Sequence, residues 1–304
     1  MAPPEGALAG SLLGRCTFPP RSTPITCAVS GGPDSLALLA LGMAAGCRVT
    51  AVHVDHGLRP GSAAEGEVVA CAAARLGARF SGVAVAVAAG PNLEARARAA
   101  RRAALPPGSA TGHTMDDQAE TVFVNLLRGS GLDGLAAMRP GPEHPLLGLR
   151  RSETHALCAS LGLDPVQDPS NTDRRFVRNR VRHELLPLAN AIAGRDLVPV
   201  LARQARLLAD EADLLEELAS GIDPADARAL AVAPDPLARR ATRRWLRDGA
   251  PHPPDLAAVE RVLAVARGQL GATDVAPGTR VRRSRGSLSS APISPEASGS
   301  VGAR

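Results

Sequence analysis

A short apolar run that leads through a glycine turn into a helix is the strongest structural signal in this chain of 304 residues. Ile25–Val29 has the length of a buried strand, and Leu36–Ala45 has the spacing of a helix. The turn between them reads Ser30-Gly31-Gly32-Pro33-Asp34-Ser35. Glycines let a backbone approach an anion, and a helix N-terminus adds N–H donors and a positive dipole end. We therefore expect an anion-binding loop here.

Strand-like and helical stretches continue to alternate along the first half of the chain. Further strands are expected at Val49–Val54, Val83–Val87 and Ser109–Gly112. Helices are expected between and after them, at 62–76, 93–105 and 113–127. This alternation predicts an α/β fold, a Rossmann-like parallel sheet with helices on both faces. Ligands of such sheets bind beyond the carboxyl ends of the strands, where three polar segments fall: Ser30–Ser35, His53–Arg59 and His113–Asp117.

The second half of the chain has a different pattern. After about Pro187 only helical periodicity remains, with leucines recurring at positions 201, 208 and 215. Shorter helices fit Leu237–Leu246 and Leu256–Val265. We therefore expect a flexible extension (1–22), an α/β catalytic domain (23–187), an α-helical domain (188–291) and a disordered tail (292–304).

Charge and cysteine usage narrow the class of protein. The chain has 35 basic residues, all of them arginine, and a net charge of +5. Eight arginines lie between Arg174 and Arg206 against two acidic residues, which favours a nucleic-acid partner. The five cysteines form no CxxC pair, which argues for a reducing cytoplasm and against a zinc or iron–sulfur site. No stretch is apolar and long enough for a membrane span, and no signal peptide is evident, so we expect a cytoplasmic protein with no membrane partner.

Candidate chemical residues cluster at the expected sheet edge. Asp117 and Glu120 share one helical face, where they suit Mg²⁺ or a substrate ammonium group, while Asp116 can act as a helix cap. Asp34 can hold a divalent cation, and the loop around it lacks the lysine of a Walker A motif. For the histidines of this edge, packing or adenine contact is as reasonable as catalysis: His53, His56 and His113.

Several blocks of the sequence resemble known families. The Ser30–Ser35 loop resembles the SGGxDS signature of the PP-loop ATP pyrophosphatases. GHTMDDQAETVFVNLLRGSGLDG at 112–134 is similar to the tRNA(Ile)-lysidine synthetases, as are HVDHGLR at 53–59, LEARARAARRAAL at 93–105, PLLGLRR at 145–151 and DPSNTDRRFVRNRVRHELLP at 168–187. The resemblance covers roughly residues 25–190. Arg102 and His144 depart from it, where the family commonly has tyrosine and arginine.

The resemblance implies a ligase that adenylates C2 of the wobble cytidine in the CAU anticodon of tRNA(Ile). The ε-amine of L-lysine then displaces AMP to give lysidine. It further implies that Asp117 and Glu120 contact the lysine and that Arg178 and Arg182 stabilise developing negative charge. The residues expected to hold ATP, with Mg²⁺ on Asp34, are Ser30, Gly31, Gly32, Pro33, Asp34, Ser35, His53 and His113. A homodimer is compatible with the sequence.

Three other functions are weighed against this one. A PP-loop 2-thiolase acting on the anticodon loop needs cysteine pairs, which the sequence lacks. A small-molecule amidotransferase or ligase has no use for the arginine block. A non-catalytic RNA-binding module would not need intact carboxylates at Asp34, Asp117 and Glu120.

Overall fold

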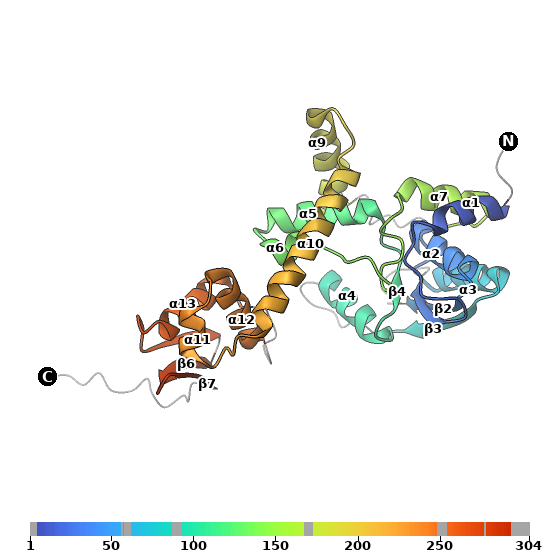
Figure 1. The fold of residues 1–304 in the computed structure, drawn as a ribbon. Helices are drawn as coiled ribbons and strands as arrows, with labels where there is room; N and C mark the ends of the chain where they lie inside the picture. The colour runs from blue at the N-terminus through green and yellow to red at the C-terminus, as the bar shows by residue number, and fades with distance from the viewer. Residues whose placement is uncertain are drawn as a thin grey trace. The chain divides into compact units, whose positions relative to one another are not determined.

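The computed structural model describes residues 5–55, 57, 62–86, 93–166, 173–247, 254–276 and 278–292. The chain divides into two compact units, Met1–Ala209 and Asp210–Arg304 (Figure 1). The division falls within one long helix, α10 (Val198–Ser220), and not at the expected boundary after residue 187. Each unit is described by itself.

A four-stranded parallel sheet organises the first unit. Its strands are β1 (Pro24–Ala28), β2 (Arg48–Asp55), β3 (Arg79–Ala84) and β4 (Ala110–Thr111), in the order β3-β2-β1-β4. The helices that alternate with them are α2 (Pro33–Ala44), α3 (Ser62–Leu76), α4 (Leu93–Ala104) and α5 (Met115–Leu127). The predicted parallel α/β architecture is confirmed.

The expected strand Val83–Val87 was wrong in its bounds. β3 begins four residues earlier, at Arg79, and most of its side chains are exposed because it is the edge strand of the sheet. An edge strand needs no continuous apolar run, so its first residues, Arg79–Ser81, carry little hydrophobic signal. The apolar residues after it drew the expectation towards the C-terminus.

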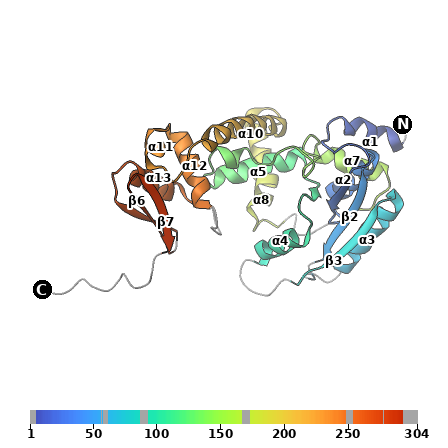
Figure 2. The same ribbon diagram turned by 60° about the horizontal axis from the view of Figure 1, so that its bottom comes forward.

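Helix α2 forms the centre of the core. Its leucines Leu36, Leu38, Leu39 and Leu41 are fully buried, and α2 contacts β1, β2, α3, α7 (Arg151–Ser160) and α1 (Glu5–Leu13) (Figures 1 and 2). Each fully buried leucine contributes about 2 kcal/mol of hydrophobic stabilisation.

The sequence predicted a flexible extension over residues 1–22, but part of this segment is ordered and packs against the core. Residues 5–13 form α1, and Ala9 and Leu12 are buried in the core. The proline and glycine content of the first 22 residues hid this short Ala/Leu helix. Residues 1–4 lie outside the described part of the chain.

The carboxyl ends of β1 and β4 lie side by side because these two strands are parallel neighbours. The chain after β4 passes so close to the start of α2 that a Cβ on Gly112 would lie 2.6 Å from the carbonyl oxygen of Asp34. Only glycine allows this approach without displacement of one backbone. The loops after these strands are thus in direct contact.

The rest of the first unit is helical. After α5 come α6 (Leu132–Leu135), α7, α8 (Val177–Arg180), a π-helical turn η2 (Val181–Leu185) and α9 (Leu186–Ala193). Val181 and Leu186 are buried in a small cluster with Ala119 and Val124 of α5. This packing holds the arginine-bearing segment 177–185 against α5.

The sequence predicted an α-helical domain in this part of the chain, but the second unit also contains a sheet. Helices α11 (Ala227–Val232), α12 (Asp235–Arg247) and α13 (Leu256–Ala266) are followed by an antiparallel sheet of β5 (Ala272–Ala276), β6 (Thr279–Ser284) and β7 (Ser287–Pro292). Only Val281 and Leu288 of β6 and β7 are buried, so alternation is too weak to signal strands. The turn Arg285-Gly286, with φ of 50° and 85°, closes this hairpin.

The expected tail 292–304 lies outside the described residues except for Pro292, which ends β7. Among the described helices, none is by itself both long and apolar enough to cross a membrane; the bent pair Val177–Ala193 and Val198–Ser220 meets the criterion only when joined.

Substitution of Gly112 by alanine tests the close approach of the two loops. The added Cβ must displace the Asp34 carbonyl, so we expect a loss of about 1–3 kcal/mol of stability and weaker nucleotide binding. Gly141→Ala is the matched control, because a Cβ there meets nothing within 4 Å. Thermal unfolding of the two variants measures the difference, and equal melting temperatures would contradict the geometry.

Candidate active site

The glycine loop at the start of α2 is fixed by its own serines. Ser35 Oγ donates to the carbonyl of Gly32 at 2.8 Å and accepts from the backbone N–H of Ser30 at 3.2 Å. Gly31 has a φ of +86°, which favours glycine, and Gly32 is the N-cap of α2 with an extended backbone. The loop is thus a rigid turn at a helix N-terminus, where anions are favoured.

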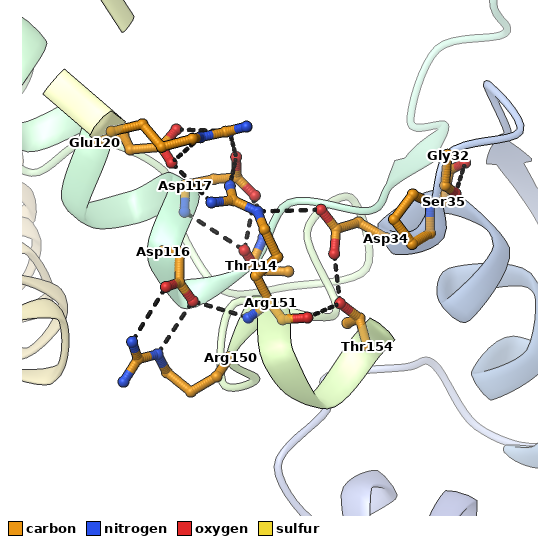
Figure 3. A network of polar contacts seen from close by, with 12 residues as sticks. Gly32, Asp34, Ser35, Thr114, Asp116, Asp117, Glu120, Arg150, Arg151 and Thr154 are labelled. Carbon is orange, nitrogen blue, oxygen red and sulfur yellow. Dashed lines mark hydrogen bonds and ion pairs between the residues drawn. The ribbon is translucent and has the colours of Figure 1, made fainter. Parts of the chain in front are cut away.

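One face of helix α7 contacts this loop through three side chains. Residues at positions i, i+3 and i+7 of the helix contact it. Arg151 Nε lies 3.5 Å from the Asp34 carboxylate, and Thr154 Oγ1 is hydrogen-bonded to the same carboxylate (Figure 3). Cys158 Sγ donates to the carbonyl of Pro33 at 3.2 Å. Asp34 therefore has a fixed orientation at the mouth of the loop.

A capping box stabilises the N-terminus of α5, where the acidic residues lie. Thr114, not Asp116, is the N-cap, and Asp117 Oδ2 accepts from the backbone N–H and the hydroxyl of Thr114, both at 2.8 Å. Asp116 instead accepts two hydrogen bonds from the Arg150 guanidinium, at 3.1 and 3.2 Å. The expected capping role of Asp116 was wrong, because the hydroxyl one position before the helix takes it.

Three arginines surround Asp117 and Glu120. Arg151 donates to Asp117 Oδ1 at 2.8 Å and to Glu120 Oε1 at 2.9 Å. Arg178 donates to the same two residues, both at 2.9 Å, and Arg182 binds both oxygens of Glu120 at 2.7 and 3.1 Å. Figure 3 shows the arrangement around Asp117 and Glu120. The two carboxylates thus share three guanidinium groups.

Burial and the neighbouring charges shift the pKa values of Asp117 and Asp34 in opposite directions. Burial raises the pKa of Asp117, but Arg151, Arg178, the Thr114 N–H and His113 outweigh it and bring the pKa down to about 2. Burial raises the pKa of Asp34 above its ordinary value despite the hydrogen bond from Thr154 and the charge of Arg151. Asp117 is therefore a permanent anion at neutral pH, and Asp34 is the carboxylate that takes up a proton more readily.

Arg151 joins the two halves of the site. Its guanidinium lies between Asp34 of the glycine loop and the Asp117–Glu120 pair, and all three carboxylates raise its pKa against the lowering effect of burial. Two of the three segments expected at the sheet edge, 30–35 and 113–117, are thereby brought together. The third, 53–59, is described only at 53–55 and 57, so His56 and Arg59 fall outside the described residues.

The candidate histidines occupy different environments. His53 is buried, and its Nδ1 is hydrogen-bonded to the carbonyl of Val29 at 2.9 Å, which favours the packing role over nucleotide contact. His113 Nδ1 lies 2.7 Å from Thr111 Oγ1, and its ring packs edge-on against His144 at 5.2 Å. His113 also adds to the positive potential at Asp117.

Sequence reasoning did not single out Arg151 and Thr154. Both belong to the segment that follows PLLGL, and with Cys158 they have the 3- and 4-residue spacing of one helical face. This spacing places the three side chains on one face of the helix, and it is the only feature of the sequence that could have indicated a functional role for them. What the sequence did not reveal is that this face packs against the start of α2.

The residues present fit one Mg²⁺ ion held jointly by the protein and a nucleotide. Within the part of the chain that the structure describes, no group of three or more His, Cys, Asp or Glu residues could hold a metal. Mg²⁺ commonly takes only one or two protein carboxylates and completes its shell with phosphates and water. Asp34, partly exposed beside the glycine loop, suits that single-ligand role.

The fold and the loop agree with comparisons with known proteins. A family model of the PP-loop domain matches residues 13–189. A tRNA(Ile)-lysidine synthase of Nocardia farcinica is 43% identical over 89% of this chain and 92% of its own length. That of Mycolicibacterium paratuberculosis is 48% identical over 73% and 74%. The chain therefore belongs to the ATP-using PP-loop proteins and, among them, to the tRNA(Ile)-lysidine synthase family.

A solved U34-tRNA thiolase from Methanococcus maripaludis shares the fold, with a TM-score of 0.51 over 67% of this chain and 78% of that one. At 18% identity, this likeness concerns the fold alone.

The depressed pKa of Asp117 predicts an acid-dependent loss of stability. Because its folded pKa of about 2 is below the ordinary 3.8, the stabilisation is complete above pH 3.8 and is lost as the pH falls through about 2. The loss amounts to roughly 2 kcal/mol. Denaturant unfolding between about pH 5 and pH 2 measures it. Asp117→Asn should lack this segment of the pH dependence; an identical slope in both proteins would refute the assignment.

Proposed function

We propose that this chain is a tRNA(Ile)-lysidine synthetase, an ATP-dependent carbon–nitrogen ligase that acts in the cytoplasm. Its substrates are ATP, L-lysine and tRNA(Ile) with a CAU anticodon. The observation that carries the proposal is the Arg151 bridge, which brings Asp34 of the glycine loop and the Asp117–Glu120 pair to one site. A site that activates a base and then delivers an amine needs an anion-binding loop and an acidic pair in reach of one another.

In the first step, the glycine loop binds the phosphates through the backbone N–H groups of Gly31 and Gly32 and the hydroxyls of Ser30 and Ser35. The C2 oxygen of the wobble cytidine attacks the α-phosphorus, and the bond to the β-phosphate breaks to release pyrophosphate. Asp34 would hold Mg²⁺, which supplies charge neutralisation at the phosphates. The arginines of the segment 177–185 favour the negative charge that develops there.

In the second step, Asp117 and Glu120 orient the ε-amine of L-lysine. The ε-ammonium loses a proton to solvent water, the resulting amine attacks C2, and the C2–O bond breaks so that AMP leaves with the bonding electrons. Asp117 stays ionised at neutral pH because its pKa is held at about 2, so it orients the ammonium by charge and is a poor proton acceptor. Arg178 and Arg182, which pair with Glu120, are the cations that would stabilise the leaving phosphate.

A thiolase that acts on an anticodon-loop base is the alternative of the same fold. Its chemistry needs reactive thiolates, which require a low thiol pKa and access. Here burial raises the pKa of Cys27 and of Cys158 to about 12 and that of Cys16 to about 11. The sequence relatives and the raised pKa values of these three thiols both favour the ligase.

The direct test incubates the purified protein with ATP, labelled L-lysine and a CAU-anticodon tRNA transcript, followed by nucleoside mass analysis. We expect lysine incorporated into the wobble nucleoside, with AMP and pyrophosphate released in equal amounts. ATP-dependent product without lysine, or sulfur incorporation, would contradict the proposal.

Asp117→Asn tests the amine site within this reaction. Loss of its charge should lower lysidine formation by at least about 100-fold, within the range seen when an oriented charge is removed from an active site, while ATP binding stays close to wild type. Asp116→Asn is the control, because this neighbouring carboxylate pairs with the Arg150 guanidinium and accepts from Arg151 only the backbone N–H, which an asparagine oxygen can still accept. Unchanged turnover in the Asp117 variant would remove this residue from the amine site.

Arg203→Ala tests tRNA docking through α10. Arg203 is exposed on the part of α10 that belongs to the first unit. If it neutralises one phosphate, its loss should weaken tRNA binding and reduce the slope of log K against log salt by about 1. Filter binding between low and moderate salt measures this slope. An unaltered slope would mean that the tRNA phosphates do not bind at Arg203.

The homodimer remains a proposal, which sedimentation of the purified protein tests.

A further inference from the structure

The carboxylates of Asp117 and Glu120, which are proposed to bind the lysine amine, have no unoccupied oxygen lone pair for a further cation. Asp117 Oδ1 accepts from Arg151 and Arg178, and its Oδ2 is taken by Thr114. Glu120 is almost wholly buried, and each of its oxygens accepts from two guanidinium groups. Since a carboxylate oxygen has about two lone-pair positions, an incoming ammonium must displace a guanidinium from this pair.

Among the three arginines, Arg151 has a second anionic partner in reach. Arg178 and Arg182 lie on one short segment and form their ion pairs with Asp117 and Glu120. Arg151 comes from α7, and its Nε also faces Asp34 at 3.5 Å, at the mouth of the glycine loop. If its guanidinium moved a short distance towards the glycine loop, it would leave Asp117 and Glu120 and pair instead with anions bound at the loop.

The balance of charge makes such an exchange depend on the nucleotide. Three guanidinium groups face Asp34, Asp117 and Glu120, so the cluster is neutral as it stands. An added ammonium would leave an excess positive charge in a largely buried place, which is unfavourable. The phosphates of a nucleotide supply the missing negative charge and a new bidentate partner for a guanidinium.

We propose that Arg151 is the positioning residue that couples nucleotide binding to amine binding: its guanidinium moves from the Asp117–Glu120 pair to the bound phosphates and so opens the pair to the lysine ammonium. The inference rests on the proposed function and adds an order of binding to it. Arginine suits this place, because it keeps its proton and is no nucleophile, so it can stand beside an activated base without attacking it.

The test is calorimetric titration of L-lysine into the full chain, with and without Mg²⁺ and α,β-methylene-ATP, whose α–β linkage resists cleavage. In the wild type we expect lysine to bind at least about tenfold tighter with the nucleotide, and by linkage the nucleotide to bind tighter with lysine by the same factor. In Arg151→Gln, lysine should bind without nucleotide at least about tenfold tighter than in the wild type, and the nucleotide effect should fall below about threefold. A structural defect would not produce tighter binding.

Arg150→Gln is the matched control, because it removes the same charge one position away, from a side chain bound to Asp116 and Asp196. It should keep the wild-type nucleotide effect. Should the glutamine variant melt early, Arg151→Met, of similar length, replaces it.

Lysine binding that ignores the nucleotide in the wild type, or a wild-type nucleotide effect in both Arg151 variants, overturns this inference and leaves the proposed function standing. Absence of lysine binding to the wild type both with and without the nucleotide contradicts the proposed function itself.

Discussion

The candidate site depends on one guanidinium shared by three carboxylates. Arg151 reaches Asp117 and Glu120 by hydrogen bonds and lies 3.5 Å from Asp34. Unpaired charges in a protein interior cost several kcal/mol each, and Arg151 offsets this cost together with Arg178 and Arg182, which also pair with Asp117 and Glu120. The bridge therefore links two elements that are separated by about 80 residues of sequence.

The bridge is possible because of where the strands end. β1 and β4 are adjacent and parallel, so the glycine loop and the start of α5 leave the sheet at the same edge. Gly112 lets the two backbones touch, and α7 packs along α2 with Arg151, Thr154 and Cys158 directed at the loop. Backbone topology thus sets the approximate distance, and the face of α7 sets the final geometry.

The sequence sufficed for the parts of this site that are local in the chain. The glycine loop and the pairing of Asp117 with Glu120 on one helical face follow from spacing alone, and parallel alternation predicts their common edge. Arg151 could not be found in this way, because its role depends on the packing of α7 against α2. The sequence also missed α1, which lies in a segment rich in proline and glycine, and the small sheet of the second unit, because one buried residue in each of β6 and β7 gives almost no periodic signal.

The arginines change what the acidic pair can do. An isolated pair of carboxylates would attract any cation, whereas a pair held by three guanidinium groups accepts a cation only in exchange for one of them. Selectivity then comes from the exchange and not from negative charge alone. The chain contains no lysine, so apart from histidine every basic side chain around this site is a permanently protonated, non-nucleophilic guanidinium. The amine that attacks an activated base here has to come from the substrate, because the protein's basic side chains carry none.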